Sequence, residues 1–339
     1  MQPPASATSR RGFGWIRLAI LAISLALVAF LLTRSADTMA TLRSLDTRLL
    51  ILITGLQTIY LLPQSYRYWI VLDAASDRTL SFWEWSRVFV VGRFLNLIIS
   101  QAGNVYRAVY LKRYHSITYG EYVTAFFAFV WLGTVLNLLL AMAVVLLAPD
   151  PGTIGRWELT GALAGAVVVI TLAPIVLSQL VRGAQEATSL WARLHNRAAA
   201  LLHSAVGMLQ DPRLIARFVG AGLVGFVIAV TIFALTFQAL SIDVALADTV
   251  LFYVLLQLTT YIVITPGNFG IQELSFGGLA EATGIGVAPG LLAGAVVRVT
   301  GVLALLGTGL ALGGLQALRE ARSGSTDNVQ PNDAGTGSG

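Results

Sequence analysis

The side chains best suited to chemistry in this chain are a few charged residues within long apolar stretches. They are four arginines and one glutamate, namely Arg67, Arg93, Arg107, Arg298 and Glu273. Ionisable side chains at membrane depth are costly to bury and usually belong to a functional site. Because a guanidinium can donate two parallel hydrogen bonds to phosphate, the excess of arginine predicts a cavity for an anion. Amide side chains occur around these charges, namely Gln57, Gln64, Asn96, Asn104, Asn137, Gln257 and Asn268.

Two glycine–asparagine breaks interrupt the apolar sequence beside these residues, over 100–107 and 265–273. Their small, turn-forming residues are Gly103 and Asn104 in the first break and Gly267, Asn268 and Gly270 in the second. Lipid offers no hydrogen-bond partner, so a broken backbone persists only where protein or a water-filled cavity satisfies it. A matched pair of breaks in two halves of a chain predicts a transport site. The helices after the breaks would direct unsatisfied N–H groups at an anionic headgroup.

Each candidate residue also has a structural explanation. Arg67 and Arg93 could extend to the membrane interface from the ends of their segments. Arg107 could be a charge that only orients the chain. Glu273 and Arg298 could form a structural pair, and Glu273 could alternatively couple transport to protons. The asparagines could satisfy the turns at the breaks.

No enzymatic motif accompanies these residues. The sequence lacks G-x-S-x-G, a Walker loop and H-E-x-x-H, and it has three histidines and no cysteine. We therefore expect no catalytic residue, metal site or cofactor, although an unfamiliar intramembrane transferase stays open as an alternative.

The composition indicates a membrane protein that crosses the bilayer several times. Of the 339 residues 56% are hydrophobic and 12% are charged, with a mean hydropathy of +0.76. Soluble domains carry about 25% charged residues. The sequence pI is near 9.7, but the basic residues lie between the apolar stretches instead of forming one stripe. This distribution is typical of orientation signals and argues against a nucleic-acid partner.

Six stretches have the roughly 20 apolar residues that a membrane-spanning helix needs. They are residues 15–33, 49–72, 120–148, 159–181, 214–240 and 287–317. Two further segments, 88–101 and 248–284, are short or interrupted, and we expect each to form a re-entrant hairpin. The fold class is therefore an all-α polytopic membrane protein with six to eight transmembrane helices and two re-entrant hairpins. Eight plain spanning helices are the alternative.

The distribution of basic residues predicts the topology. The N-terminus, the 182–213 loop and the C-terminus carry most arginines, whereas the 149–158 and 241–248 loops contain few basic residues. Basic loops stay in the cytoplasm, so we expect both termini on the cytoplasmic side of the cell membrane. The basic 34–48 loop does not fit this topology.

Three full crossings in each half then invert the second half relative to the first. The expected organisation is a disordered N-terminus (1–14), one transmembrane domain (15–318) with half-repeats 15–148 and 159–317, and a disordered tail (319–339).

Both breaks resemble motifs of the transmembrane domain of lysylphosphatidylglycerol synthases, a broad flippase-like family. Residues 103–108 (Gly-Asn-Val-Tyr-Arg-Ala) and the basic end at 111–113 are similar to the family's Pro-x-x-x-Gly-Glu-x-x-Arg-Ala segment. Residues 266–273 (Pro-Gly-Asn-Phe-Gly-Ile-Gln-Glu) resemble its Pro-Gly-x-x-Gly-x-x-Glu motif, with Arg298 in the next helix. Arg67-Tyr68-Trp69 is a third, weaker point of similarity.

The chain departs from the family pattern at the first break. Ile99 stands where the family has proline, and Asn104 where it often has glutamate. The cytosolic aminoacyl-transfer domain of the full synthases has no counterpart in this sequence, so lysyl transfer is not expected.

The resemblance implies that the protein moves a lipid with a charged headgroup between leaflets. The cargo would be a phospholipid or a polyprenyl-phosphate-linked sugar, and membrane lipids are the expected partners. Arg107, Arg298 and the half-helix ends would bind the phosphate, and Glu273 would pair with an arginine or with a cationic part of the headgroup. The alternative is a non-transporting membrane partner of an envelope glycosyltransferase or other lipid-modifying enzyme.

Overall fold

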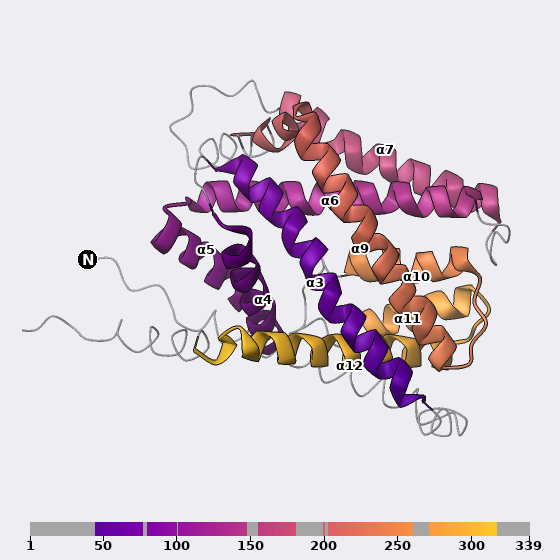
Figure 1. The fold of residues 1–339 in the computed structure, drawn as a ribbon. Coiled ribbons are helices and arrows are strands. Elements are labelled where there is room, and N and C mark those ends of the chain that lie inside the picture. Colours follow the sequence, from indigo (N-terminus) through magenta and orange to yellow (C-terminus); the bar gives the residue numbers. More distant parts are fainter. Residues whose placement is uncertain are drawn as a thin grey trace, which may run out of the picture.

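The computed structural model describes residues 45–76, 80–99, 101–147, 155–180, 199–200, 203–259 and 271–316. Every regular element in these ranges is helical (Figure 1). The first half contains α3 (Thr47–Ala75), α4 (Phe82–Ile98), α5 (Ala102–His115) and α6 (Tyr119–Leu147). The second contains α7 (Arg156–Leu180), η2 (Met208–Gln210), α9 (Pro212–Ala239), α10 (Leu246–Thr259), α11 (Ile271–Ala282) and α12 (Val287–Ala311).

Five of these helices are long and apolar enough to cross a membrane. They are α3, α6, α7 (over Arg156–Leu177), α9 and α12. They match five of the six predicted spans, and the sixth, at 15–33, lies outside the described residues. The predicted class, an all-α polytopic membrane protein, is confirmed.

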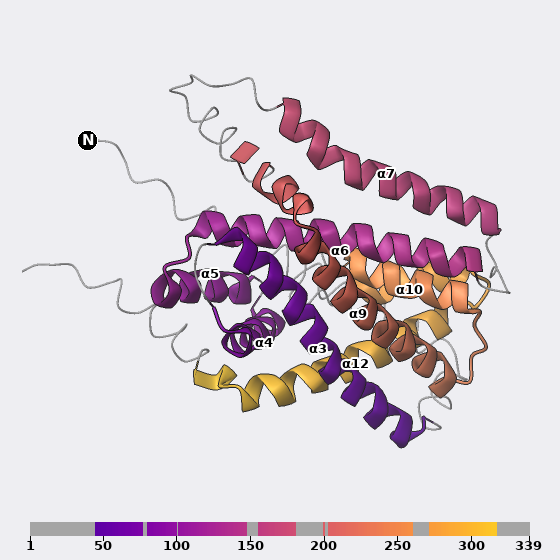
Figure 2. The same cartoon turned by 45° about the horizontal axis from the view of Figure 1, so that its top comes forward.

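Small residues bring the long helices together. Gly225 of α9 faces the side chains of Tyr60 and Pro63 of α3, and Gly222 faces Leu136 of α6. Lipid tails are as apolar as the helices, so close packing over glycine is a main source of helix association in a membrane. The result is a bundle in which α3 and α9 lie against each other and α7 flanks α6 (Figure 2).

Residues 88–101 do not form a hairpin by themselves, and the predicted boundaries were wrong. Residues 88–98 belong to α4, and α5 returns beside α4 as the second arm. Gln101 occupies the left-handed region, with φ of 67°, and this reverses the chain. Gly103 then lies directly on the backbone of Gly92, where a Cβ would come within 1.6 Å of the carbonyl oxygen. This close approach pairs the two arms.

The second half contains a similar pair of short helices, α10 and α11, which contact each other. The break between them, 260–270, lies outside the described residues. Helix α10 has 14 residues and α11 has 12. At about 1.5 Å of rise per residue, both helices are too short to cross a bilayer. The helices α3 to α6 and the helices α9 to α12 therefore follow the same order: long, short, short, long.

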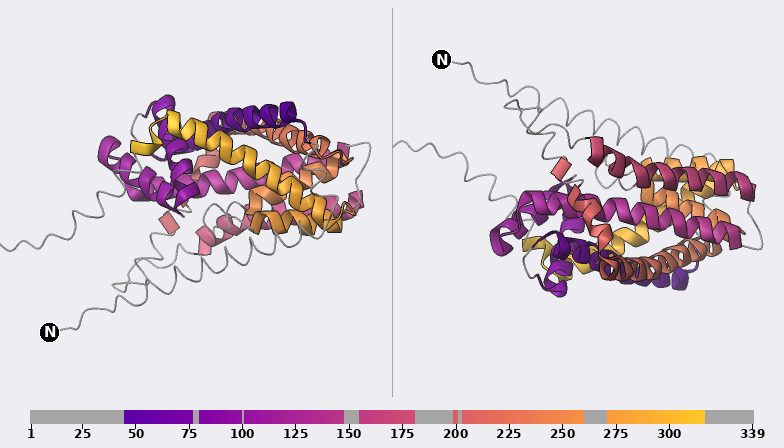
Figure 3. Two further views of the ribbon diagram at one scale, coloured as in Figure 1. Left: turned by 90° about the horizontal axis from the view of Figure 1, so that it is seen from below. Right: turned by 90° about the horizontal axis from the view of Figure 1, so that it is seen from above.

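The two short pairs lie at opposite ends of the bundle. The α4–α5 pair is next to the end of α3 and the start of α6, whereas α10 and α11 are next to the end of α9 and the start of α12 (Figures 1 and 3). Helix α12 contacts both pairs: Gly294 packs on Phe276 of α11, and Gly309 packs on Phe94 of α4. This arrangement agrees with the predicted inversion of the second half.

A methyl group at Gly103 should separate the arms of the first pair. For Gly103→Ala we expect a loss of about 1–3 kcal/mol of stability, because the new Cβ overlaps the carbonyl of Gly92. The readout is the thermal unfolding temperature of the purified protein in detergent. Gly220→Ala in α9 is the matched control, since nothing lies within 4 Å of its added Cβ. Equal unfolding temperatures for the two variants would contradict the packing.

Candidate functional site

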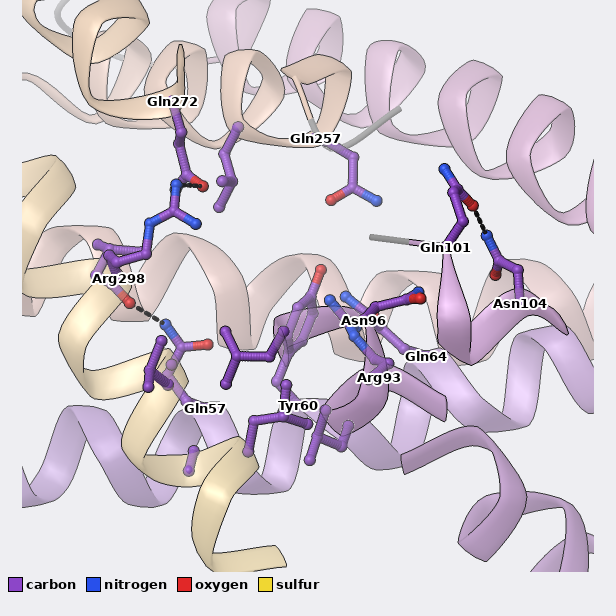
Figure 4. Close-up of a pocket in the computed structure, with 18 residues that line it drawn as sticks. Gln57, Tyr60, Gln64, Arg93, Asn96, Gln101, Asn104, Gln257, Gln272 and Arg298 are labelled. Atoms are coloured by element: carbon purple, nitrogen blue, oxygen red, sulfur yellow. Dashed lines mark hydrogen bonds between the residues drawn. The ribbon is translucent and has the colours of Figure 1, made fainter. Parts of the chain in front are cut away.

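A cavity of about 290 Å³ opens between the two short pairs and the helices α3 and α12. It is called the central cavity below. Its polar wall consists of two arginines, seven amides and one tyrosine, namely Arg93, Arg298, Gln57, Gln64, Gln101, Gln257, Gln272, Asn96, Asn104 and Tyr60 (Figure 4). The described part of the lining contains no acidic residue. The guanidinium and amide N–H groups of this wall can donate hydrogen bonds, which suits an anion.

Arg298 of α12 is held by two residues from the start of α11. Its Nε donates to Oε1 of Glu273 at 2.6 Å, and its Nη2 donates to Oε1 of Gln272 at 2.8 Å. Gly290 and Gly294 of α12 bring the two helices this close, because Gly294 lies one turn before Arg298 and contacts the backbone of Glu273. The predicted pairing of Glu273 with Arg298 is thus present, and Arg298 lines the central cavity.

Arg93 of α4 lies on the cavity wall contributed by the first half. Its Nη1 donates to Oε1 of Gln64 in α3, and its guanidinium lies over the ring of Phe89 at 5.8 Å. Each half therefore supplies one arginine that a glutamine oxygen positions.

The first break contributes side chains to the wall of the central cavity. Gln101 and Asn104 line the central cavity and are hydrogen-bonded to each other. The N–H groups expected to be free here are occupied: Ala102 donates to the carbonyl of Ile99, and Gly103 donates to Oδ1 of Asn96 at 2.7 Å. Asparagine side chains and turn carbonyls thus satisfy the start of α5, and the expected backbone site for phosphate is not formed at this break.

Arg107 does not line the central cavity, contrary to its predicted role in binding the headgroup. It is buried between α4 and α5, where its Nε donates to the carbonyl of Gly103 and its Nη2 to Asn104. Its guanidinium also lies over the rings of Tyr68 and Phe89. Arg107 therefore connects the two arms of the first pair, because it is hydrogen-bonded to the first turn of α5 and lies over the ring of Phe89 in α4.

Arg67 is likewise placed away from the cavity, with only 1% of its surface exposed. Its guanidinium lies over the rings of Phe129 and Phe218, between α6 and α9. It does not extend to the interface. Asn137 is also buried elsewhere, where it accepts a hydrogen bond from the hydroxyl of Tyr253 at 3.0 Å.

The candidate residues of the second break, Gly267, Asn268 and Gly270, lie outside the described residues. Gln257 and Gln272, which come before and after residues 260–270 in the chain, line the central cavity. Three polar lining residues were not among the predicted ones: Tyr60, Gln101 and Gln272. Gln101 and Gln272 occur within the two breaks, 100–107 and 265–273, so their polar type beside the glycines was the available signal. Tyr60 carried no such signal.

The family model described as the lysylphosphatidylglycerol synthase TM region matches residues 15–309, most of the chain. The chain belongs to this family, as its motifs predicted. In this family the transmembrane region is the non-catalytic, flippase-like part. Comparisons with curated proteins and with solved structures gave no match.

Removing one partner of the Arg298–Glu273 pair should destabilise the protein. Arg298→Gln leaves the buried carboxylate of Glu273 without its cation, and a cost of about 3–5 kcal/mol is expected. Replacing both residues by glutamine should recover most of this loss, since neither charge remains. The free energy of unfolding in detergent would be measured for the single and double variants.

The control is Glu281→Gln, which removes an exposed carboxylate from the same helix and should change the stability little. A double variant as unstable as Arg298→Gln would contradict the expected compensation.

Proposed function

We propose that this member of the lysylphosphatidylglycerol synthase transmembrane family moves an anionic lipid between leaflets, with the headgroup phosphate in the central cavity. The observation that carries the proposal is the composition of that cavity: both arginines of its wall face one space, and the described lining contains no carboxylate. Arg298 and Arg93 would contact the phosphate, and Glu273 would hold Arg298 in position. Arg107, Gly103 and Asn104 would maintain the shape of the first break.

The size of the cavity supports binding of a headgroup and not of a whole lipid. A volume of about 290 Å³ is at the lower limit of sites that hold small ligands, roughly 300–1,000 Å³. The acyl or polyprenyl chains would stay in the bilayer while the headgroup passes through the protein. The nonpolar part of the lining, which includes Leu61, Leu256 and Leu305, would contact the start of those chains.

The charge distribution over the described residues supports an orientation. The end of the bundle with the α4–α5 pair carries the larger set of bases, namely Arg87, Lys112, Arg113, Arg213 and Arg217. The opposite end has Arg48 and Arg156. By the positive-inside rule the first end would face the cytoplasm, with both chain termini on that side of the cell membrane. The second pair would then enter from the outer face.

Transport should depend on Arg93. Replacing it by glutamine is expected to slow leaflet exchange of a labelled anionic lipid at least about tenfold, because a hydrogen bond to a charged group contributes roughly 1.5–3 kcal/mol. Exchange would be followed in proteoliposomes that contain fluorescent phosphatidylglycerol, by quenching of the label in the outer leaflet. Arg87→Gln is the matched control, as Arg87 lies on the same helix, is exposed and does not line the cavity.

Two results would contradict the proposal. One is equal exchange rates for wild type and Arg93→Gln. The other is an absence of exchange for every anionic or polyprenyl lipid, combined with a copurifying envelope enzyme that loses activity without this protein. The second result would favour a non-transporting membrane partner.

A further inference from the structure

Carboxamides dominate the polar wall of the central cavity, with five glutamines and two asparagines. A carboxamide offers an oxygen that accepts hydrogen bonds and an NH₂ group that donates them. The hydrogen-bond partner within the protein determines which of these two groups faces the cavity. Guanidinium and backbone N–H groups can only donate, so the amide oxygen must face them.

Three amides use their oxygen within the protein. Arginines occupy the oxygens of Gln64 and Gln272, and the backbone N–H of Gly103 occupies the oxygen of Asn96. Their NH₂ groups are left as donors toward the cavity. With the two guanidinium groups, this wall mainly donates hydrogen bonds to whatever the cavity holds.

Gln57 has the opposite orientation. Its Nε2 donates to the carbonyl of Val297 at 3.4 Å, so its oxygen is the group that faces the cavity. Gly301 lies beside this side chain, and a Cβ at that position would be in ordinary contact with the amide at 3.7 Å. Tyr60 lines the same wall, and its hydroxyl lies 3.5 Å from the hydroxyl of Tyr253. Gln57 therefore adds a strong acceptor to the donors of this wall.

We infer that the headgroup is a phosphate joined to a polyhydroxylated group without an amine, such as glycerol, inositol or a hexose. The inference rests on the proposed function and specifies its substrate. Phosphate and hydroxyl oxygens accept hydrogen bonds from the donors, and a hydroxyl hydrogen can satisfy the oxygen of Gln57.

An ammonium group fits this wall poorly. It can only donate hydrogen bonds and would lie beside two arginines. The nearest described carboxylate, Glu273, is already paired with Arg298. Ethanolamine and aminoacyl headgroups would therefore bind more weakly than a polyol of similar size.

The test is binding to the purified full-length chain in detergent, measured by calorimetric titration. The probes are dihexanoyl lipids with glycerol, inositol, ethanolamine or lysyl-glycerol headgroups and a short-chain polyprenyl-phosphate hexose. Glycerol, inositol or hexose probes should bind at least about tenfold more tightly than the ethanolamine and lysyl probes. The comparison of the hexose probe with the phospholipids separates the two sources of a polyol phosphate.

A second measurement uses Gln57→Met, which removes the acceptor at similar volume. It should weaken polyol binding about three- to tenfold and leave binding of a dihexanoyl phosphatidic acid, which has a phosphate without a polyol, unchanged. Gln238→Met, at an exposed position outside the central cavity, is the control and should behave as wild type. The unfolding temperature of each variant reports whether it is folded.

Amine lipids that bind as tightly as polyol lipids would overturn the inference and leave the proposed transport of anionic lipids standing. Failure of every probe to bind would overturn both. An unchanged polyol affinity in a folded Gln57→Met variant would also overturn the inference.

Discussion

The structure depends on one constraint: every polar group within the apolar bundle needs a partner, because lipid supplies none. The first break shows how this is met. Asn96 accepts from the N–H of Gly103, and Arg107 donates to the carbonyl of the same glycine. The two arms can then lie backbone to backbone, since Gly92 and Gly103 have no side chains to separate them. Backbone groups at the start of α5 are thereby paired where this segment lines the central cavity.

The charged residues meet this constraint to different degrees, and Nε and Nη1 of Arg67 have no hydrogen-bond partner among the described residues. Arg298 is neutralised by Glu273 and positioned by Gln272, whereas the described partner of Arg93 is the neutral amide of Gln64. Arg67 and Arg107 are instead surrounded by aromatic rings. Four arginines of one chemical type thus fall into two groups: two that face the cavity and two that hold helices together. Only the first group lines the central cavity.

Helix α12 links the two halves mechanically. It contacts α11 near its start and α4 near its end, in both cases over glycine. It also carries Arg298 on the wall of the cavity. Helix α12 therefore connects the two short pairs to each other and to Arg298 through direct packing contacts.

Hydropathy and charge counting sufficed to predict the five described spanning helices and the two interrupted segments, because these features depend on composition along a single helix. The family was predicted from the motifs at the two breaks. The Glu273–Arg298 pair was also predictable, as it was the one acid near a membrane arginine in a recognisable motif. The extent of the first hairpin and the location of Arg107 could not be predicted from the sequence. Both depend on which helix faces α4, and the sequence contains no signal for the approach of Gly103 to Gly92. Tertiary packing alone decided which arginines face the cavity and which way each amide points, because those choices follow from partners far away in the chain.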